Sequence, residues 1–364
     1  MKFLINKIMS DTNKSSEEKA SILIIYTGGT IGMAEDPKTG SLEPFDFKNL
    51  VDHVPELKDV EHLYSSVQFD PPLDSSKVGP QDWAKMAKAV ADNYDNYDGF
   101  VILHGTDTMA YTASALSFML ENLNKPVIIT GSQLPVGKFR TDGKTNLITA
   151  IEIAAAKKNN IAVVPEVCIC FQDYLLRGNR SKKVNADYFR AFETFNYPPL
   201  AHIGVEIEID EEFVIKNNPD KALIPHYEMD PNIVVLKLLP GISPQIMKSI
   251  LNTPNIKGVV METFGVGNAP AFDWFIDILK EADAKGIVVV NVTQCMIGSV
   301  AMDIYDTGDA MVSAGVVSGY DMTTESAVTK MMYLFGKGCS PKEVKDQLGV
   351  SIIGEMTIHK TVEN

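Results

Sequence analysis

Two short segments, each following a hydrophobic run, hold side chains that could attack a carbonyl group. Residues 27–30 read Thr-Gly-Gly-Thr, and residues 104–108 read His-Gly-Thr-Asp-Thr. A threonine hydroxyl is a nucleophile toward a carbonyl carbon once a base removes its proton, and flanking glycines let backbone N–H groups approach a ligand closely. Thr30, Thr106 and Asp107 are therefore candidates for chemistry on a small polar ligand with carbonyl or carboxylate oxygens.

Either segment alone is better explained as local structure. Thr-Gly-Gly-Thr is typical of a tight turn, and Thr-Asp-Thr ahead of an apolar helical pattern is typical of a helix N-cap. The run Gly28–Gly32 also lacks the G-x-G-x-x-G spacing of a dinucleotide loop. Together they indicate more, because parallel sheets bind ligands beyond the carboxyl ends of their strands. If the two preceding strands are neighbours, Thr30 and Thr106 face one cleft.

The composition limits the class of protein. A chain of 364 residues, 45% hydrophobic and 22% charged, is typical of a globular protein of about two domains. The formal net charge of −14 and the lack of a basic tract argue against a nucleic-acid partner. No apolar run approaches the ~20 residues of a membrane helix, and residues 1–20 lack a signal-peptide core. We therefore expect a cytoplasmic protein without nucleic-acid or membrane partners.

The four cysteines do not predict a metal site. Cys168 and Cys170 lie in the apolar run VCICF, and Cys295 and Cys339 follow much later. These spacings are not those of zinc or redox motifs. We expect the first two to be buried free thiols.

Apolar β-branched runs alternate with helical patterns along the chain. The predicted strands are Ile22–Tyr26, Phe100–Leu103, Val127–Thr130, Ile161–Val164, Val167–Cys170, Ile233–Leu238, Val259–Met261 and Ile287–Val292. Helices are predicted from Pro80, after Asp107, over Phe272–Ala284 and over Thr323–Phe335. This alternation indicates an α/β fold with a parallel sheet covered on both faces.

An acidic segment divides the chain into two predicted domains. Residues 204–231 show short alternating stretches and no long helical pattern, so they are interpreted as a connector that carries a hairpin. We expect a flexible tail over 1–20 and a larger N-terminal α/β domain with a flavodoxin-like parallel sheet over 21–203. A smaller C-terminal α/β domain is expected over 232–364.

The two threonine segments, in this order, resemble those of the L-asparaginases, specifically the cytoplasmic bacterial type I group. The resemblance extends from about Ser21 to Gly354 and includes KPVIITGSQLP, YLLRGNRSKK, GVGNAP and GIVVVNVTQC. It implies hydrolysis of L-asparagine to L-aspartate and ammonia by a protein of two α/β domains. It also implies a homodimer or dimer of dimers, with no metal or organic cofactor.

The resemblance assigns catalytic roles to individual residues. Thr30 matches the nucleophile, which would form a β-aspartyl ester. Thr106 and Asp107 match the functional pair of HGTDT, and Lys183, rather than Lys182 beside it, best matches the lysine that completes the set. A proton-sharing Lys183 next to Thr106 and Asp107 could relay a proton.

Other residues match the family's substrate-binding positions. Ser75, in Asp74-Ser75-Ser76, would hold the α-carboxylate of asparagine, and Asp107, with Asp74 as a weaker candidate, would hold the α-ammonium. This leaves the side-chain amide of the substrate over Thr30. Judged by its residues alone, the Asp74 segment is favoured as a helix-capping turn before Pro80.

Three further residues are expected around the substrate. Gly29 would offer close backbone approach, and Ser132 would form part of the pocket wall and oxyanion environment. Asn268 would be contributed by a neighbouring subunit, although a loop cap is the simpler interpretation of this residue.

Two departures from the family pattern are visible. Family members usually carry a tyrosine in the loop after the nucleophile, but residues 33–47 contain none, and Tyr26 in the preceding strand is not an obvious substitute. The asparagine effector site of some members uses a threonine before the catalytic lysine and an arginine before GVGNAP. Here Lys182 and Glu262 occupy those places, while Cys295 still matches.

Three alternatives stay open. A dual asparaginase-glutaminase would also accept L-glutamine, which has one more methylene group than L-asparagine. One methylene group gives an enzyme only about 1–3 kcal/mol of discrimination between two substrates. A glutaminase-like subunit of a tRNA amidotransferase shares the scaffold but would bring a further N-terminal domain and a nucleic-acid surface. A catalytically silent asparagine-binding protein would explain the two departures, but the intact set Thr30, Thr106, Asp107 and Lys183 argues against it.

Lys182 and Glu262 predict that asparagine does not activate the protein cooperatively. Initial rates of ammonia release should rise hyperbolically with L-asparagine, because the threonine and arginine of the effector site are both replaced. Rates measured from micromolar to tens of millimolar substrate check this expectation. A sigmoidal curve would contradict it.

Overall fold

The structure is a computed structural model that describes residues 6–8, 19–35, 42–44, 53–216, 218–270, 272–302 and 306–358. The chain forms two compact units: unit 1 comprises Met1–Thr194 and Pro198–Tyr227, and unit 2 comprises Phe195–Tyr197 and Glu228–Asn364. The expected α/β class with two domains is confirmed. Most of the expected tail over 1–20 lies outside the described residues.

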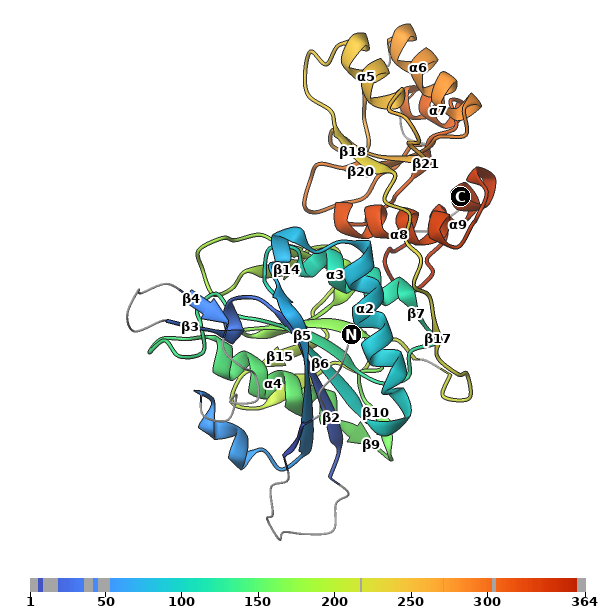
Figure 1. The fold of residues 1–364 in the computed structure, drawn as a ribbon. Coiled ribbons are helices and arrows are strands. Elements are labelled where there is room, and N and C mark those ends of the chain that lie inside the picture. Colours follow the sequence, from blue (N-terminus) through green and yellow to red (C-terminus); the bar gives the residue numbers. More distant parts are fainter. Residues whose placement is uncertain are drawn as a thin grey trace. The chain divides into compact units, whose positions relative to one another are not determined.

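Unit 1 is built on a mainly parallel sheet, nine-stranded in its described part (Figure 1). In spatial order the strands are β1 (Asn6–Ile8), β5 (Leu63–Leu73), β2 (Ser21–Gly28), β6 (Gly99–Leu103), β8 (Val127–Thr130), β11 (Val167–Phe171), β12 (Tyr174–Arg177), β15 (Ala201–Ile203) and β16 (Ile207–Ile209). The five from β5 to β11 are parallel. Numbered along the chain, these five follow the flavodoxin-like order 2-1-3-4-5, with its switch point between β2 and β6.

Helices cover the centre of this sheet. β6 and β8 are buried along their whole length, as continuous apolar runs predict. α2 (Pro80–Asp92) packs against α3 (Met109–Met119), and α4 (Gly143–Ala155) packs on β2, β6, β8 and β11 (Figure 1). The helices predicted from Pro80 and after Asp107 are thus confirmed.

Short elements connect these layers. The 3-10 turns are η1 (Thr30–Gly32), η3 (Pro55–Asp59), η4 (Ser75–Lys77), η5 (Tyr94–Asn96) and η6 (Gly178–Arg180). Paired short strands are β3 (Met33–Glu35) with β4 (Leu42–Pro44), β7 (Leu120–Glu121) with β17 (Ile224–Pro225), β9 (Lys157–Lys158) with β10 (Ile161–Ala162), and β13 (Ser181–Lys183) with β14 (Phe192–Thr194). The expected connector over 204–231 contains β16, which forms a hairpin with β15, and β17.

Cys168 and Cys170 are fully buried free thiols on β11, as expected. Burial raises the pKa of both, that of Cys170 to about 12. Neither is therefore a reactive thiolate at neutral pH.

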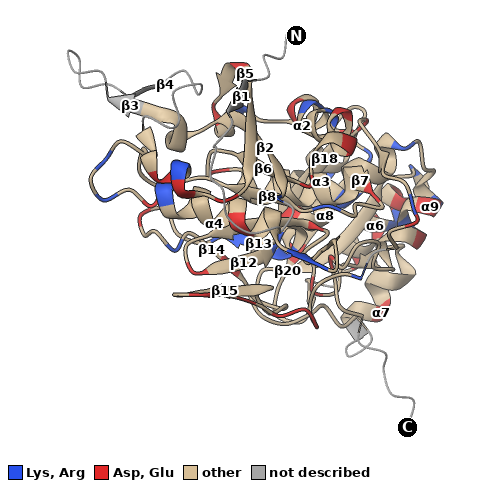
Figure 2. Cartoon of the chain, turned by 90° about the horizontal axis from the view of Figure 1, so that it is seen from below, with Lys and Arg blue, Asp and Glu red and all other residues tan. Residues whose placement is uncertain are grey.

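Charged residues are dispersed along the chain. Figure 2 shows Lys and Arg positions mixed with Asp and Glu positions rather than gathered on one element. Within the ranges that the structure describes, no helix combines the length and the apolar character needed to cross a membrane.

Unit 2 has a parallel sheet that is four-stranded in its described part. The strands are, in order, β18 (Ile233–Lys237), β19 (Gly258–Thr263), β20 (Val288–Thr293) and β21 (Val317–Ser318). The helices are α5 (Pro244–Leu251), α6 (Asp273–Ala284), α7 (Asp306–Ser313), α8 (Thr324–Gly336) and α9 (Pro341–Leu348). One apolar cluster joins the sheet to α5 and α6 and includes Leu236, Met247, Met261, Phe275 and Val289. The predicted strands and both predicted helices of this region are confirmed.

A buried ion pair fastens the C-terminal segment to α8. Lys330 Nζ lies 2.6 Å from Glu355 Oε1, and both side chains are 0% exposed. Lys330 also donates to the carbonyl of Val350, and Glu355 accepts from the N–H groups of Ile352 and Ile353. Burial alone would raise the pKa of Glu355, but Lys330 and these N–H groups hold it below its usual value.

Glu355→Gln should lower the free energy of unfolding by about 3–5 kcal/mol, because the Lys330 charge then stays buried without its counter-ion. The double change Lys330→Met with Glu355→Leu should be much closer to wild type, since no buried charge remains. Urea denaturation measures both variants. Equal losses in the two would refute this explanation.

Candidate active site

The candidate site lies where the loops after β2 and β6 meet. Tyr26 and Leu103 are register partners in these neighbouring parallel strands, so the following loops leave the sheet side by side. A Cβ atom at Gly29 would lie 2.5 Å from the backbone nitrogen of Gly105, and Gly29 has a φ of 89°. Only glycine fits this close approach. The strands are neighbours, which was the condition set in the sequence analysis, and they bring the two threonine segments together.

A third loop, after β5, joins this contact. Ser75 is buried at the start of η4, and a Cβ atom at Gly105 would lie 2.5 Å from its Oγ. Thr108 Oγ1 donates to the carbonyl of Ser75 at 2.6 Å. Asp74 instead caps η4, because its carboxylate accepts from the hydroxyl and the N–H of Ser76, which lower its pKa. The structure thus places Ser75 at the site and uses Asp74 in the turn.

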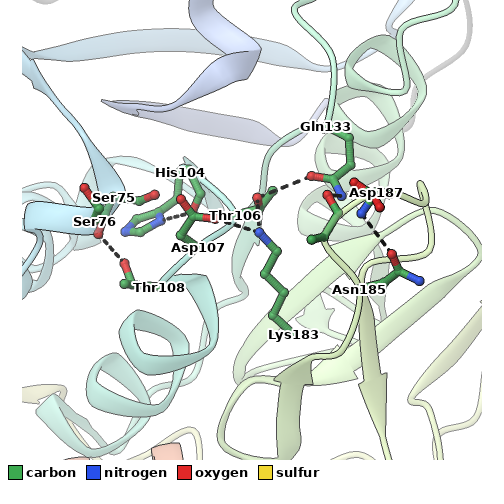
Figure 3. A network of polar contacts seen from close by, with 12 residues as sticks. Ser75, Ser76, His104, Thr106, Asp107, Thr108, Gln133, Lys183, Asn185 and Asp187 are labelled. Atoms are coloured by element: carbon green, nitrogen blue, oxygen red, sulfur yellow. Dashed lines mark hydrogen bonds and ion pairs between the residues drawn. The ribbon is translucent and has the colours of Figure 1, made fainter.

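Thr106, Asp107 and Lys183 form one polar cluster (Figure 3). Lys183 Nζ donates to Thr106 Oγ1 at 2.9 Å and to Asp107 Oδ1 at 2.7 Å. The Lys183 side chain is only 20% exposed, whereas that of Asp107 is 66% exposed. Lys182 precedes Lys183 in β13, and because successive side chains of a strand point to opposite faces, it lies on the other face. An ammonium, a hydroxyl and a carboxylate in direct contact can exchange a proton with a bound substrate.

Gln133 also contacts this cluster, although sequence reasoning assigned the neighbouring Ser132. Thr106 Oγ1 donates to Gln133 Oε1 at 3.4 Å, and Gln133 Nε2 donates to the carbonyl of Tyr188 at 3.0 Å. Ser132 is buried, and its hydroxyl donates to the carbonyl of Leu134. No local pattern singles out Gln133, because its partners lie 27 and 55 residues away along the chain.

Asp142 holds the loop that carries Gln133. Its carboxylate accepts from the backbone N–H groups of Gln133 and Leu134 and from Asn146 Nδ2. Burial raises the pKa of this carboxyl above its usual value. Its hydrogen bonds thus come from two backbone N–H groups and one asparagine side chain, and they fix the loop.

Thr30 opens the turn η1 and is half-buried. Among the described residues, its hydroxyl has no hydrogen-bond partner. Tyr26 supports the turn, because its hydroxyl donates to the carbonyl of Gly32 at 3.2 Å and its ring occupies the space that a Cβ at Gly32 would fill. Burial raises the pKa of Tyr26 to about 12, so it stays a neutral donor. Much of the loop that lacks the expected tyrosine, residues 36–41 and 45–47, lies outside the described residues.

The remaining predicted residues belong to unit 2. Asn268 follows β19 in a turn bridged to Phe264, and its Oδ1 accepts from Thr307 Oγ1 at 3.3 Å. Glu262 accepts from Thr324 Oγ1 at 2.6 Å, and Cys295 is an exposed free thiol. Within the described part of the chain, no group of three or more His, Cys, Asp or Glu side chains could hold a metal ion.

Comparison with known proteins identifies relatives over both units. The family model "Asparaginase, N-terminal" matches residues 21–214, and "Glutaminase/Asparaginase C-terminal domain" matches residues 232–348. The chain is 43% identical to L-asparaginase 1 of Escherichia coli over 350 residues, which cover 93% of this chain and 99% of that protein. It is 41% identical to the 60 kDa lysophospholipase of Mus musculus over 362 residues, 93% of this chain and 63% of that protein.

A solved structure is also similar to this chain. The crystal structure of L-asparaginase I from Vibrio cholerae aligns with a TM-score of 0.86 at 43% identity. The alignment covers 94% of this chain and 100% of that chain.

Gly29→Ala should destabilise the protein by at least about 1–3 kcal/mol, because its φ of 89° and ψ of 171° suit only glycine. The clash with Gly105 adds to this loss and forces the two loops apart. Gly137→Ala is the matched control, since a Cβ there meets nothing within 4 Å, and it should stay within about 0.5 kcal/mol of wild type. Urea unfolding measures the stability of both variants. Equal stability of Gly29→Ala and Gly137→Ala would contradict the contact.

Proposed function

This chain belongs to the asparaginase family, with its N-terminal and C-terminal domains both present, and on that premise we propose that it hydrolyses L-asparagine to L-aspartate and ammonia. The enzyme is a hydrolase that acts on an amide C–N bond. The observation that supports this substrate and mechanism best is the contact of Lys183 with both Thr106 and Asp107, beside the approach of Gly29 to Gly105.

In the proposed mechanism, Thr30 is the nucleophile. Its Oγ forms a bond to the side-chain amide carbon, Lys183 gives a proton to the leaving nitrogen, which departs as ammonia, and the Thr30 proton passes through Thr106 to restore the Lys183 ammonium. Water then attacks the β-aspartyl ester, and Thr30 regains a proton as aspartate is released. Backbone N–H groups of the loops stabilise the negative charge on the carbonyl oxygen in both steps.

The two charged ends of the amino acid bind to residues beside this centre. The Ser75 hydroxyl donates to the α-carboxylate, an assignment supported by the burial of Ser75 against Gly105. Asp107 binds the α-ammonium, supported by a carboxylate that is 66% exposed and so within reach of a ligand. Gly29 and Ser132 complete the pocket wall.

The assembly and location follow from the same premise. We infer a homodimer or dimer of dimers in which Asn268 of one subunit completes the site of another, and a cytoplasmic enzyme of asparagine catabolism. L-Glutamine is the closest rival substrate, because one methylene group gives little discrimination. A lysophospholipid is the second rival, given the name of the mouse relative.

Ammonia and fatty-acid release test the substrate. Purified protein should release ammonia from L-asparagine much faster than from L-glutamine, and no fatty acid from lysophosphatidylcholine. Equal rates with both amides would indicate a dual asparaginase-glutaminase. No ammonia from either amide, with asparagine still bound in calorimetry, would indicate a binding protein and overturn the proposal.

Thr30→Ala should leave a folded protein that binds L-asparagine but releases ammonia slower by on the order of 10³-fold or more, because the nucleophile is gone. Thr27→Val is the matched control from the same segment. Within the described residues, Thr27 Oγ1 makes a single hydrogen bond, which it donates to the carbonyl of Leu103 at 2.8 Å, so its loss should cost about 1 kcal/mol of stability and leave turnover in place. Wild-type turnover by Thr30→Ala would remove Thr30 from the mechanism.

A further inference from the structure

A buried histidine lies directly behind the candidate site. His104 follows β6 and is 1% exposed. Its Nδ1 lies 2.7 Å from the carbonyl oxygen of Gly105, and its Nε2 lies 3.0 Å from Thr112 Oγ1 (Figure 3 shows His104 beside Thr106). Trp83 Nε1 donates to the same Thr112 oxygen at 3.0 Å. Both ring nitrogens are therefore engaged inside the protein.

These partners determine which nitrogen carries the proton. A carbonyl oxygen can only accept, so Nδ1 of His104 must be the donor to Gly105. The indole N–H of Trp83 can only donate, which leaves the hydroxyl proton of Thr112 free to point at Nε2. Burial lowers the pKa of His104 to about 4, so the ring is neutral at neutral pH. His104 is thus a neutral Nδ1–H tautomer.

The tautomer orients the peptide between Gly105 and Thr106. In a planar trans peptide the C=O and N–H groups point in opposite directions. His104 draws the Gly105 carbonyl toward the interior, so the Thr106 N–H points away from the ring. Within the described residues, this N–H has no acceptor. Gly105 has no room to turn, because it lies against Gly29 and Ser75.

We propose that His104 is a positioning residue for amide hydrolysis, which holds the Gly105 carbonyl inward so that the Thr106 N–H is presented to the oxyanion of the substrate. Thr112 and Trp83 support it by keeping its proton on Nδ1. The inference rests on the proposed function. It adds a residue that touches neither substrate nor nucleophile, and it explains why a histidine precedes the Gly-Thr-Asp segment.

Three variants separate positioning from packing. His104→Leu fills the space without a donor, and His104→Asn leaves a larger void but keeps an amide N–H that can reach the Gly105 carbonyl. We expect kcat for L-asparagine to fall about 100-fold in His104→Leu, as when an oxyanion donor is lost, with little change in KM. His104→Asn should recover most of this loss. His202→Leu, at an exposed histidine, is the control and should match wild type.

A packing role predicts the opposite order. His104→Asn would then be at least as impaired as His104→Leu, because it removes more buried volume, and kcat would follow the loss of thermal stability. Either result would overturn the proposal. The proposal would be supported if kcat recovers in His104→Asn relative to His104→Leu while thermal stability does not.

The tautomer is measured independently of turnover. In protein with ¹⁵N-labelled histidine, the resonance that disappears in His104→Asn should show a protonated Nδ1 and an unprotonated Nε2, unchanged from pH 8 to pH 6. A protonated Nε2, or titration in this range, would refute the inference. This readout needs no substrate, so it is distinct from a failure of the wild type to release ammonia, which would overturn the proposed function instead.

Discussion

The close approach of Gly29 to Gly105 is the constraint on which the site depends. Two backbones can touch in this way only if Gly29 carries no Cβ and if β2 and β6 are neighbours with Tyr26 level with Leu103, while the absence of a Cβ at Gly105 makes room for Ser75. Neighbouring strands at this point are also what the flavodoxin-like order produces, because the order reverses between them. The fold, the register and Gly29 therefore serve one contact, which has a threonine segment on each side.

Polar groups around this contact divide into two kinds. Some are buried, and each of these makes a hydrogen bond that helps to hold a loop in place: Thr112, Asp142 and Thr27. Satisfying every such group avoids the cost of leaving a polar atom unpaired in an apolar interior. Thr30, Thr106 and Lys183 are only half-buried and so are open to a ligand. The structure thus separates the groups that hold the loops from those available for chemistry.

Much of the fold could be predicted from local patterns. Fully buried strands such as β6 and β8 are continuous apolar runs, and α2 begins with a proline at its first turn. β5 was not predicted, because serines and the Asp70-Pro71-Pro72 sequence interrupt its apolar residues, and it is a strand through its pairing with β2. α9 was also missed, although Ser340 and Glu343 form a capping box that could have identified it.

The sequence by itself determined the reactive residue types, their order along the chain and the family that they resemble. Tertiary structure decided which of them meet. Lys183 reaches Asp107 across 76 residues of chain, and Gln133 rather than Ser132 reaches Thr106. The physical reason is one of distance. Hydrogen bonds and ion pairs act over about 3–4 Å, and local periodicity specifies the faces of a strand but not the distant strand beside which it will pair.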